Sequence, residues 1–397
     1  MLGGVYQCTL PSNPARSPRV RDRKVARMHP LEIADLCRWA RLPGMHAHRW
    51  LVAREAGIRS IDDARRASPS VWRSLGWPAS TQKALSNPQT INVDDDLAAI
   101  EKHGLHLVAA DDPLYPPLLK NIDHAPAVLF IRGDPAILAA AQLAVIGSRH
   151  PTALGERTAR DFAFHFASLG LVVTSGLALG IDAAGHRAAL LAGGKTVAVC
   201  ACGLDRTYPD RHAKLAADIA ASGALVSEFP PGTPPLASHF PRRNRLISGL
   251  SLGVLVVEAA ARSGSLVTAR YAAEQGREVF AIPGSIHSPL SRGCHQLLRQ
   301  GATLVECADD VLSELKNIQL NQSDANELTP PDPPRETALR LDNPSEILLD
   351  ALGFEPTSLD ALIASTGLSS TSVASLLLTL ELQGRAASDA RGRYFRL

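Results

Sequence analysis

Short runs of apolar residues alternate with longer amphipathic stretches between residues 141 and 315. The runs hold few polar positions, as Gly253–Val257 does, and such runs are typical of strands buried on both faces. Strands are expected near 143–146, 171–174, 196–200, 224–227, 253–257, 278–282 and 302–305. Helices are expected near 154–169, 181–192, 211–222, 242–250, 265–275 and 293–300. Strands that alternate with helices through short connections predict an α/β core with a parallel sheet between two helical layers.

The segment before this core has a helical pattern. Leu31, Ile33, Leu36 and Trp39 recur at helical spacing, and the turn Leu42–Met45 leads into a second helix. Two helices around this turn resemble a helix-hairpin-helix, which presents backbone N–H groups to DNA phosphates. An ordinary helix–helix turn fits the same residues, and the sequence leaves both interpretations open.

The segment after the core predicts a small separate module. Helices expected at Ser358–Ala364 and Ser369–Leu382 flank a short turn, and Gly384–Phe395 has the pattern of a hairpin, so the module resembles a winged helix. Winged helices bind DNA or proteins. The second helix begins without Arg or Lys, which argues against sequence-specific reading of DNA.

Six segments follow from these patterns, with a Pro-rich basic arm at the start and a polar, Pro-rich linker before the last module. Patterned sequence begins just after Met28, so Met28 is a candidate start of the natural chain. The predicted segments are a disordered arm 1–28, a helical domain 29–90, a connector 91–140 with one helix and two strands, the α/β core 141–315, a linker 316–344 and the winged helix 345–397.

Composition limits the classes of function. The 397 residues carry a formal net charge of +2, so a nucleic-acid site must be a local patch. Aromatic residues make up only 5%, which argues against a surface built mainly from stacked bases. The six cysteines lack paired CxxC spacing, and neither a run of about 20 apolar residues nor an apolar N-terminal leader is present. A cytoplasmic protein is expected.

Several strands of the core are followed by Gly, Ser and Arg residues. Gly147, Ser148 and Arg149 follow the first strand, where glycine permits close approach of an anion and Arg149 can grip a phosphate with two N–H groups. Ser175 and Gly176 follow the second strand. Asp182 opens the next helix, either as a cap or as an organiser of the site.

Two further loops carry the same residue types. Arg242, Arg243, Asn244 and Arg245 lie at an expected helix start between apolar residues, and Ser263–Ser265 (Ser263, Gly264, Ser265) precedes the next helix. Because such loops gather at one edge of an open parallel sheet, we expect a surface for several phosphates.

Signals for catalysis and cofactors are weak. Gly194–Thr196 mimics the end of a P-loop but precedes a strand, and no GxGxxG follows the first core strand. The 13 histidines show no metal-ligand spacing, and His186 reads as a packed residue. Glu228 and Glu258 end strands without an evident acid/base partner. No catalytic residue, cofactor or metal is therefore predicted.

The ordered motifs resemble the DNA-processing protein A family (DprA, also called Smf). They run through about 170 residues of core and are specific as a set. The matching motifs are Ile146–Arg149, Ser175–Asp182 with His186, Tyr208–Pro209, Ser227–Gly232, Phe240–Arg245, Ser263–Ala269, Ile282–Ser285 and Arg292–Cys294. Gly185 stands where the family often has Ala.

The resemblance implies an extended Rossmann-like core between a helical (SAM/HhH-like) N-terminal domain and a winged helix. It also implies sequence-independent binding of single-stranded DNA, protection of incoming DNA in natural transformation, loading of the recombinase RecA and a homodimer joined through the core. The alternative is a nucleotide phosphoribohydrolase of the lysine-decarboxylase-like (LOG) kind, whose Pro-Gly-Gly-x-Gly-Thr motif Pro283–Ile286 does not match. A winged-helix transcription regulator is a third possibility.

Overall fold

The computed structural model describes residues 29–87, 92–315, 345, 348–349, 351–352, 356–389 and 392–397. The predicted arm 1–28 and linker 316–344 lie outside the described residues. The N-terminal part is helical, as predicted. Its helices are α1 (Pro30–Arg41), α2 (Ala47–Glu55), α3 (Ile61–Arg66), α4 (Pro69–Ser74) and α5 (Ala79–Ser86). They pack around Trp39, whose ring meets those of Trp50 and Trp77 edge to face.

The central part is one nine-stranded sheet. Its elements are α6 (Asp94–His103), β1 (Leu105–Ala109), α7 (Pro117–Lys120), β2 (Val128–Gly133), the 3₁₀ helix η3 (Pro135–Ala139), β3 (Gln142–Ile146), α8 (Ala153–Ser168), β4 (Val172–Ser175), α9 (Ile181–Leu191), β5 (Thr196–Val199), the 3₁₀ helix η4 (Asp210–His212), α10 (Ala213–Ser222), β6 (Ala224–Ser227), α11 (His239–Leu250), β7 (Gly253–Val256), α12 (Ser265–Glu274), β8 (Glu278–Ala281), α13 (Arg292–Arg299), β9 (Thr303–Leu304) and α14 (Ala308–Leu315). The strand order is β1-β2-β6-β5-β4-β3-β7-β8-β9.

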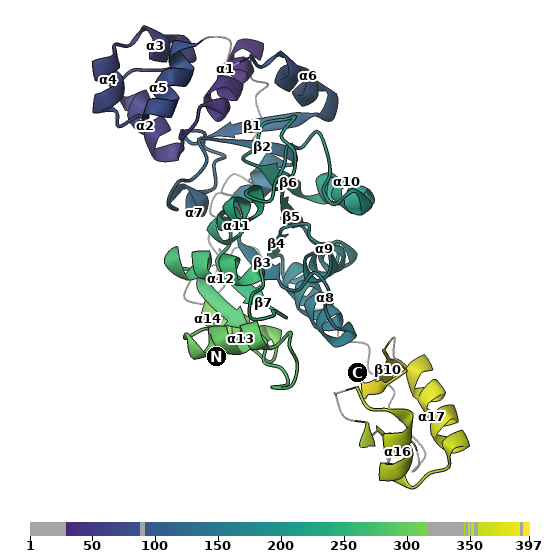
Figure 1. Cartoon of the computed structure of the whole chain (residues 1–397). Coiled ribbons are helices and arrows are strands. Elements are labelled where there is room, and N and C mark those ends of the chain that lie inside the picture. The colour runs from purple at the N-terminus through teal and green to yellow at the C-terminus, as the bar shows by residue number, and fades with distance from the viewer. Residues whose placement is uncertain are drawn as a thin grey trace, which may run out of the picture.

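The seven core strands from β3 to β9 are parallel, and every one was expected from its apolar run. Alternate residues of β3 face opposite layers: Leu143 and Val145 pack with α8 and α9, while Ala144 and Ile146 belong to the larger core that includes α11 and α12. Figure 1 shows these two helix pairs on the two sides of the sheet. The Rossmann-like architecture is confirmed.

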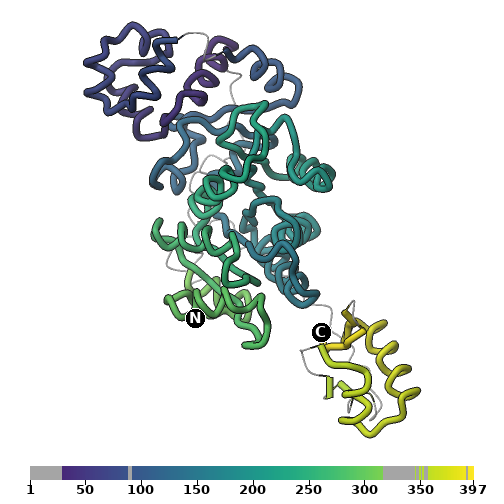
Figure 2. Tube along the Cα trace, in the orientation of Figure 1, coloured from purple at the N-terminus to yellow at the C-terminus, as the bar shows by residue number. Residues whose placement is uncertain are grey.

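The connector contributes more than the sequence indicated. Its β1 and β2 pair antiparallel with each other, and β2 pairs antiparallel with β6, so the sheet continues across residue 140. The parallel sheet therefore has an antiparallel extension at one edge. In the Cα trace the helical N-terminal part stands beside this extension (Figure 2). The predicted boundary at 140/141 stays a prediction.

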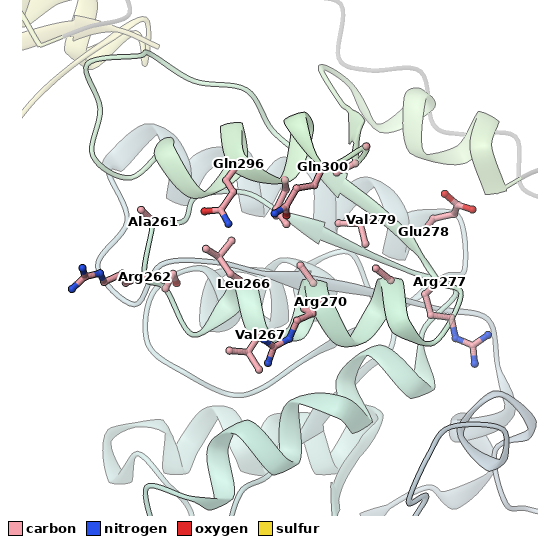
Figure 3. Close-up of a pocket in the computed structure, with 16 residues that line it drawn as sticks. Ala261, Arg262, Leu266, Val267, Arg270, Arg277, Glu278, Val279, Gln296 and Gln300 are labelled. Carbon is pink, nitrogen blue, oxygen red and sulfur yellow. The ribbon is translucent and has the colours of Figure 1, made fainter.

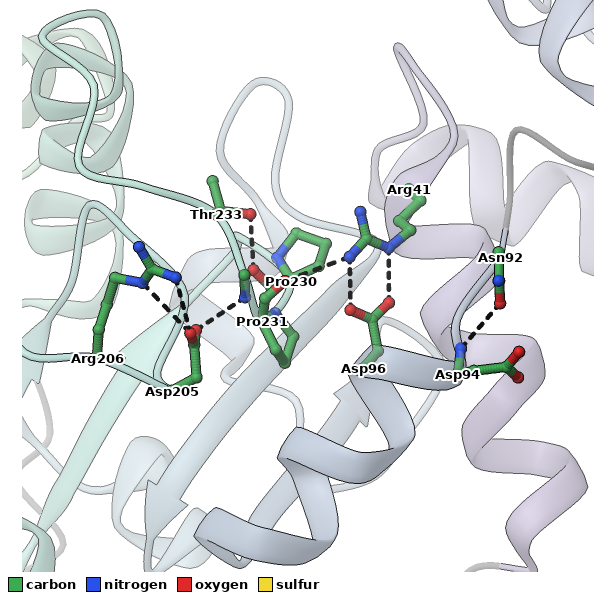
Figure 4. A network of polar contacts seen from close by, with 10 residues as sticks. Arg41, Asn92, Asp94, Asp96, Asp205, Arg206, Pro230, Pro231 and Thr233 are labelled. Atoms are coloured by element: carbon green, nitrogen blue, oxygen red, sulfur yellow. Dashed lines mark hydrogen bonds and ion pairs between the residues drawn. The ribbon is translucent and has the colours of Figure 1, made fainter.

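Polar contacts fix the N-terminal helices to the core. Arg41, at the end of α1, donates to both carboxylate oxygens of Asp96 on α6, with Nε–Oδ2 at 2.6 Å and Nη2–Oδ1 at 2.5 Å. Its Nη2 also donates to the backbone oxygen of Pro231, 3.2 Å away in the loop after β6 (Figure 4). The N–H of Ala47 donates to the backbone oxygen of Ala125 at 2.7 Å. The helical domain is therefore held against the sheet.

The C-terminal module has the predicted winged-helix elements. They are α16 (Leu359–Thr366), α17 (Ser370–Leu382), β10 (Ala386–Ser388) and β11 (Tyr394–Arg396), and the two strands pair antiparallel. Among the described residues no single helix is long and apolar enough to cross a membrane. The helices α16 and α17, which meet at a bend of 111°, together have the length and composition of a membrane span, and nothing more is shown of them in this respect.

Candidate nucleic-acid interface

The candidate site lies where the chain reverses its progress across the sheet. From β3 the chain moves to β4 and its neighbours on one side, and it later returns to β7 on the other side of β3. The loops that follow β3 and β7 therefore leave neighbouring strands beside a topological switch point. In open α/β sheets, ligands bind in the crevice outside the carboxyl ends of the strands at such a point.

A groove of about 510 Å³ occupies this position, and we call it the crevice. Three strand-end loops and the first turns of α11 and α12 form its walls. Its polar lining residues are Ser148, Arg149, Asp182, Arg243, Asn244, Arg262, Ser263, Ser265 and Thr268. Gly147 and Gly264 also line it, so loops that lie more than 100 residues apart in sequence meet as predicted.

The loop after β3 provides an exposed cation on a closely packed backbone. A Cβ at Gly147 would lie 2.7 Å from the Ile181 side chain and 2.9 Å from the backbone oxygen of Glu258, so only glycine fits. Ser148 is nearly buried, and its Oγ accepts the N–H of His150 at 3.1 Å. Arg149 is exposed, with its guanidinium 5.7 Å from the ring centre of Phe240.

The loop after β4 is part of the interior of the site. Ser175 is fully buried, and its hydroxyl donates to the backbone oxygen of Val145 at 2.7 Å. The N–H groups of Gly176 and Ala178 donate to one carboxylate oxygen of Asp182 at 3.0 and 3.3 Å. Asp182 therefore organises this loop, which answers the question that the sequence left open. Neither Ser175 nor Gly176 lines the crevice.

The arginine-rich start of α11 divides between two sides of the helix. Arg243 is buried, and its Nη1 donates to the backbone oxygens of Gly176, at 2.5 Å, and Val199. Burial lowers the pKa of Arg243, and the charge of Asp182 opposes that shift. The side chain of Asn244 donates to the backbone oxygen of Gly264 at 3.4 Å. Arg243 thus forms a fixed, positively charged floor of the crevice.

Arg242 and Arg245 face away from the crevice and share one oxygen of Glu228. The Arg242 Nη2 lies 2.8 Å and the Arg245 Nη2 2.5 Å from Glu228 Oε2. The structure therefore brings together eight of the twelve predicted residues at the crevice and places Ser175, Gly176, Arg242 and Arg245 elsewhere. The spacing explains the split: residues 242 and 245 are one helical turn apart, whereas 243 points to another side.

The loop after β7 adds a cation that sequence reasoning missed. Arg262 is exposed and directly precedes the Ser263–Ser265 loop, where the Ser263 and Ser265 hydroxyls lie 2.6 Å apart. Its position in a strand-end loop beside Gly and Ser repeats the pattern of Arg149, and this signal was available. Arg262 and Ser263 also border a second groove of about 720 Å³ between α12 and α13 (Figure 3). Leu266, Val279 and Leu297 give that groove an apolar lining.

The carboxylates near the crevice hold backbone in place. Glu258 accepts from the Thr152 N–H at 2.9 Å and from its hydroxyl at 2.6 Å, and burial raises the pKa of this carboxyl. His186 is buried with its Nδ1 2.7 Å from the Thr196 hydroxyl, and burial lowers its pKa to about 3.

Across the described parts of the chain, no group of three or more His, Cys, Asp or Glu residues could hold a metal ion.

The fold and the site together define a Rossmann-like binding protein with an anion-suited crevice. A profile of the family described as "DNA recombination-mediator protein A" matches residues 106–316, and one described as "DprA winged helix domain" matches residues 329–390. The chain belongs to this DNA-processing protein A (DprA/Smf) family.

Three relatives show the extent of the similarity. Protein Smf of Escherichia coli (strain K12) is 46% identical over 322 residues, which cover 80% of this chain and 83% of that protein. DNA processing protein DprA of Bacillus subtilis (strain 168) is 42% identical over 229 residues, 57% of this chain and 77% of that protein. The X-ray structure of DprA from Streptococcus pneumoniae matches with a TM-score of 0.57 and 37% identity over 72% of this chain and 98% of that chain.

Proposed function

We propose that this protein binds single-stranded DNA without sequence preference, with its phosphates in the crevice. The observation that carries the proposal is the convergence of Arg149 and Arg262, both exposed, above the fixed charge of Arg243. Arginine forks and backbone close to glycine suit phosphate oxygens, which are common to every nucleotide. Membership of a DNA-processing family agrees with this chemistry.

The test compares single-stranded with duplex oligonucleotides of mixed sequence at two or more salt concentrations. We expect preference for single strands, little dependence on sequence, and a log–log salt slope of about −0.7 for each phosphate neutralised. Binding that ignores salt, or that selects one duplex sequence, would contradict the proposal. The second outcome would favour a winged-helix regulator.

We propose that the crevice binds its ligand without catalysing a reaction. Glu258 accepts two hydrogen bonds from Thr152, and Glu228 forms ion pairs with Arg242 and Arg245. Neither carboxylate is therefore free to act as an acid or base. The phosphoribohydrolase alternative predicts release of free base from nucleoside monophosphates. Chromatography of such an incubation separates the two, and released base would reject the non-catalytic proposal.

We propose further that the protein protects incoming DNA during natural transformation and loads RecA, as the family resemblance implies. A cytoplasmic location is part of this proposal, and it agrees with five described cysteines that form no disulfide, four of them buried. Recruitment is testable by adding RecA to DNA coated with a single-strand-binding protein. We expect RecA filaments to form faster when this protein is present.

We also propose a homodimer through the core, at the sheet edge formed by β9. Leu304 lies on this two-residue edge strand with 49% of its surface exposed. We expect Leu304→Glu to convert a dimer to a monomer in analytical ultracentrifugation, because it places a charge in an apolar contact. The control is Leu191→Glu at the end of α9, 81% exposed, which should leave the dimer intact. Equal effects of both variants would contradict this edge.

A further inference from the structure

We propose that another groove, on the side of α11 away from the crevice, binds further nucleotides of the same DNA strand. We call it the α11 groove. It lies between the helical N-terminal domain and the core and has a volume of about 950 Å³. This inference rests on the proposed function and extends it, because it gives the N-terminal domain a share in the binding of DNA.

Six segments form the walls of the α11 groove. They are the end of α1 with the α1–α2 turn, the start of α2, the chain after α7, Glu228 after β6, the outer face of α11 and the end of α12. Its charged and aromatic lining residues are Arg41, His46, Arg49, Asp123, His124, Glu228, Arg242, Arg245, Tyr271 and Glu274. The Leu42–Met45 turn, whose surroundings in the sequence resemble a helix-hairpin-helix, is therefore part of a wall of the α11 groove.

The first turn of α11 connects the two grooves. Arg243 and Asn244 line the crevice, whereas Arg242 and Arg245 line the α11 groove. Ser238 is the N-cap of this helix, and the exposed Pro241 also lines the crevice. A strand that leaves the crevice can pass over this first turn, where neighbouring residues line the two grooves, and enter the α11 groove.

Arg242 is the side chain best placed to move from a protein partner to a phosphate. Its side chain is 57% exposed, and its guanidinium lies 5.1 Å from the ring centre of Phe229. Glu228 is only 2% exposed and also pairs with Arg245, so it stays neutralised if Arg242 turns outward. Two arginines share one carboxylate here, which leaves one positive charge beside that pair. Of the other acidic lining residues, Glu274 lies 3.8 Å from Arg270, and Asp123 offsets part of the positive charge of the groove.

A second, partly buried cation and several rings complete the groove. The Nη1 of Arg49 donates to the backbone oxygen of Gly44 at 2.5 Å, so this charge is held at the turn. His46 and His124 meet edge to face at 5.1 Å, and Tyr271 contributes another partly buried ring. Cations along a groove with ring faces beside them are what single strands of mixed sequence require.

The α11 groove is formed before any ligand arrives. The bonds of Arg41 to Asp96 and Pro231, and that of Ala47 to Ala125, hold its two sides together (Figure 4). A preformed groove avoids the entropic cost of ordering a domain on binding. A strand that fills both grooves therefore gains affinity from each without the cost of bringing the two domains together.

The test uses the double variant Arg49→Ala/Arg242→Ala in the full chain and oligothymidylates from about 4 to about 16 nucleotides. The control is Arg66→Ala/Arg157→Ala, which removes the same charge from exposed arginines on α3 and α8 that line neither groove. Fluorescence anisotropy gives the affinity at each length. Thermal unfolding checks that both variants fold, which we expect because Arg245 still pairs with Glu228.

We expect the parent and the control to gain affinity with length beyond what the crevice accommodates. The double variant should bind the shortest strands like the parent and the longest strands about tenfold or more weakly, as loss of one or two phosphate contacts predicts. Equal affinities of variant and parent at every length would overturn the inference. A parent that binds no oligonucleotide would overturn the proposed function itself.

Discussion

Replacing Arg149 with alanine should weaken binding of single-stranded DNA about tenfold or more, equally for all sequences. Arg149 is exposed at the crevice and lies against Phe240, which positions its guanidinium without neutralising its charge. Hydrogen bonds to charged groups are among the stronger ones in proteins, and a lost phosphate contact removes no information about base sequence. Fluorescence anisotropy with homopolymer and mixed-sequence oligonucleotides measures the effect.

Two companion variants make the Arg149 result specific. Arg149→Lys should recover part of the affinity, because it restores the charge but not the planar fork. Arg160→Ala removes a charge that is also exposed from α8, outside the crevice, and should bind nearly as the parent does. If Arg149→Ala bound single-stranded DNA with the affinity of the parent, or no more weakly than Arg160→Ala does, Arg149 would not be part of the binding site.

Replacing Arg243 with alanine should act first on the fold. The side chain is buried, donates to the Gly176 and Val199 backbone oxygens and attracts the buried Asp182. Its removal leaves buried acceptors and an uncompensated carboxylate, at a cost of about 3 kcal/mol or more. The melting temperature should fall by roughly 6–12 °C, and DNA binding should weaken because the Gly176–Asp182 loop loses its support.

The matched control for Arg243→Ala is its neighbour Arg242→Ala. Arg242 is largely exposed and its partner Glu228 keeps Arg245, so the melting temperature should change by no more than a few degrees. Differential scanning fluorimetry of the two variants and the parent gives the comparison. If Arg243→Ala melted with the parent and only lost affinity for DNA, the side chain would contact the strand directly and not support the loop.

The sequence predicted the core well because strands buried on both faces need apolar residues at nearly every position. Gly253–Val257 and most of its counterparts are apolar runs typical of strands buried on both faces, and each became a strand of the sheet, although β9 lies at its edge. It did not reveal that β1 and β2 extend this sheet in antiparallel fashion. Val128–Ile131 has the composition of a strand, but pairing direction depends on contacts with β6, which lies almost 100 residues later.

The candidate site was predictable in outline, because loops after parallel strands meet at one edge. Individual roles were not predictable, since they depend on which way each side chain points. Ser175 ends β4 and Arg149 lies just after β3, yet one is fully buried and the other exposed. Within Arg242–Arg245, helical geometry directs the first and last side chains to one groove and the middle two to the other, and the sequence of a basic run does not show that division.

A structure of the protein bound to an oligothymidylate tests the central claim most directly. We predict successive phosphates in the crevice, within hydrogen-bond distance of the Arg149 and Arg262 guanidinium groups and of the Ser263–Ser265 loop. The bases should make no sequence-specific contacts. A strand bound only to the winged helix, or one that leaves the loops after β3 and β7 empty, would contradict this account.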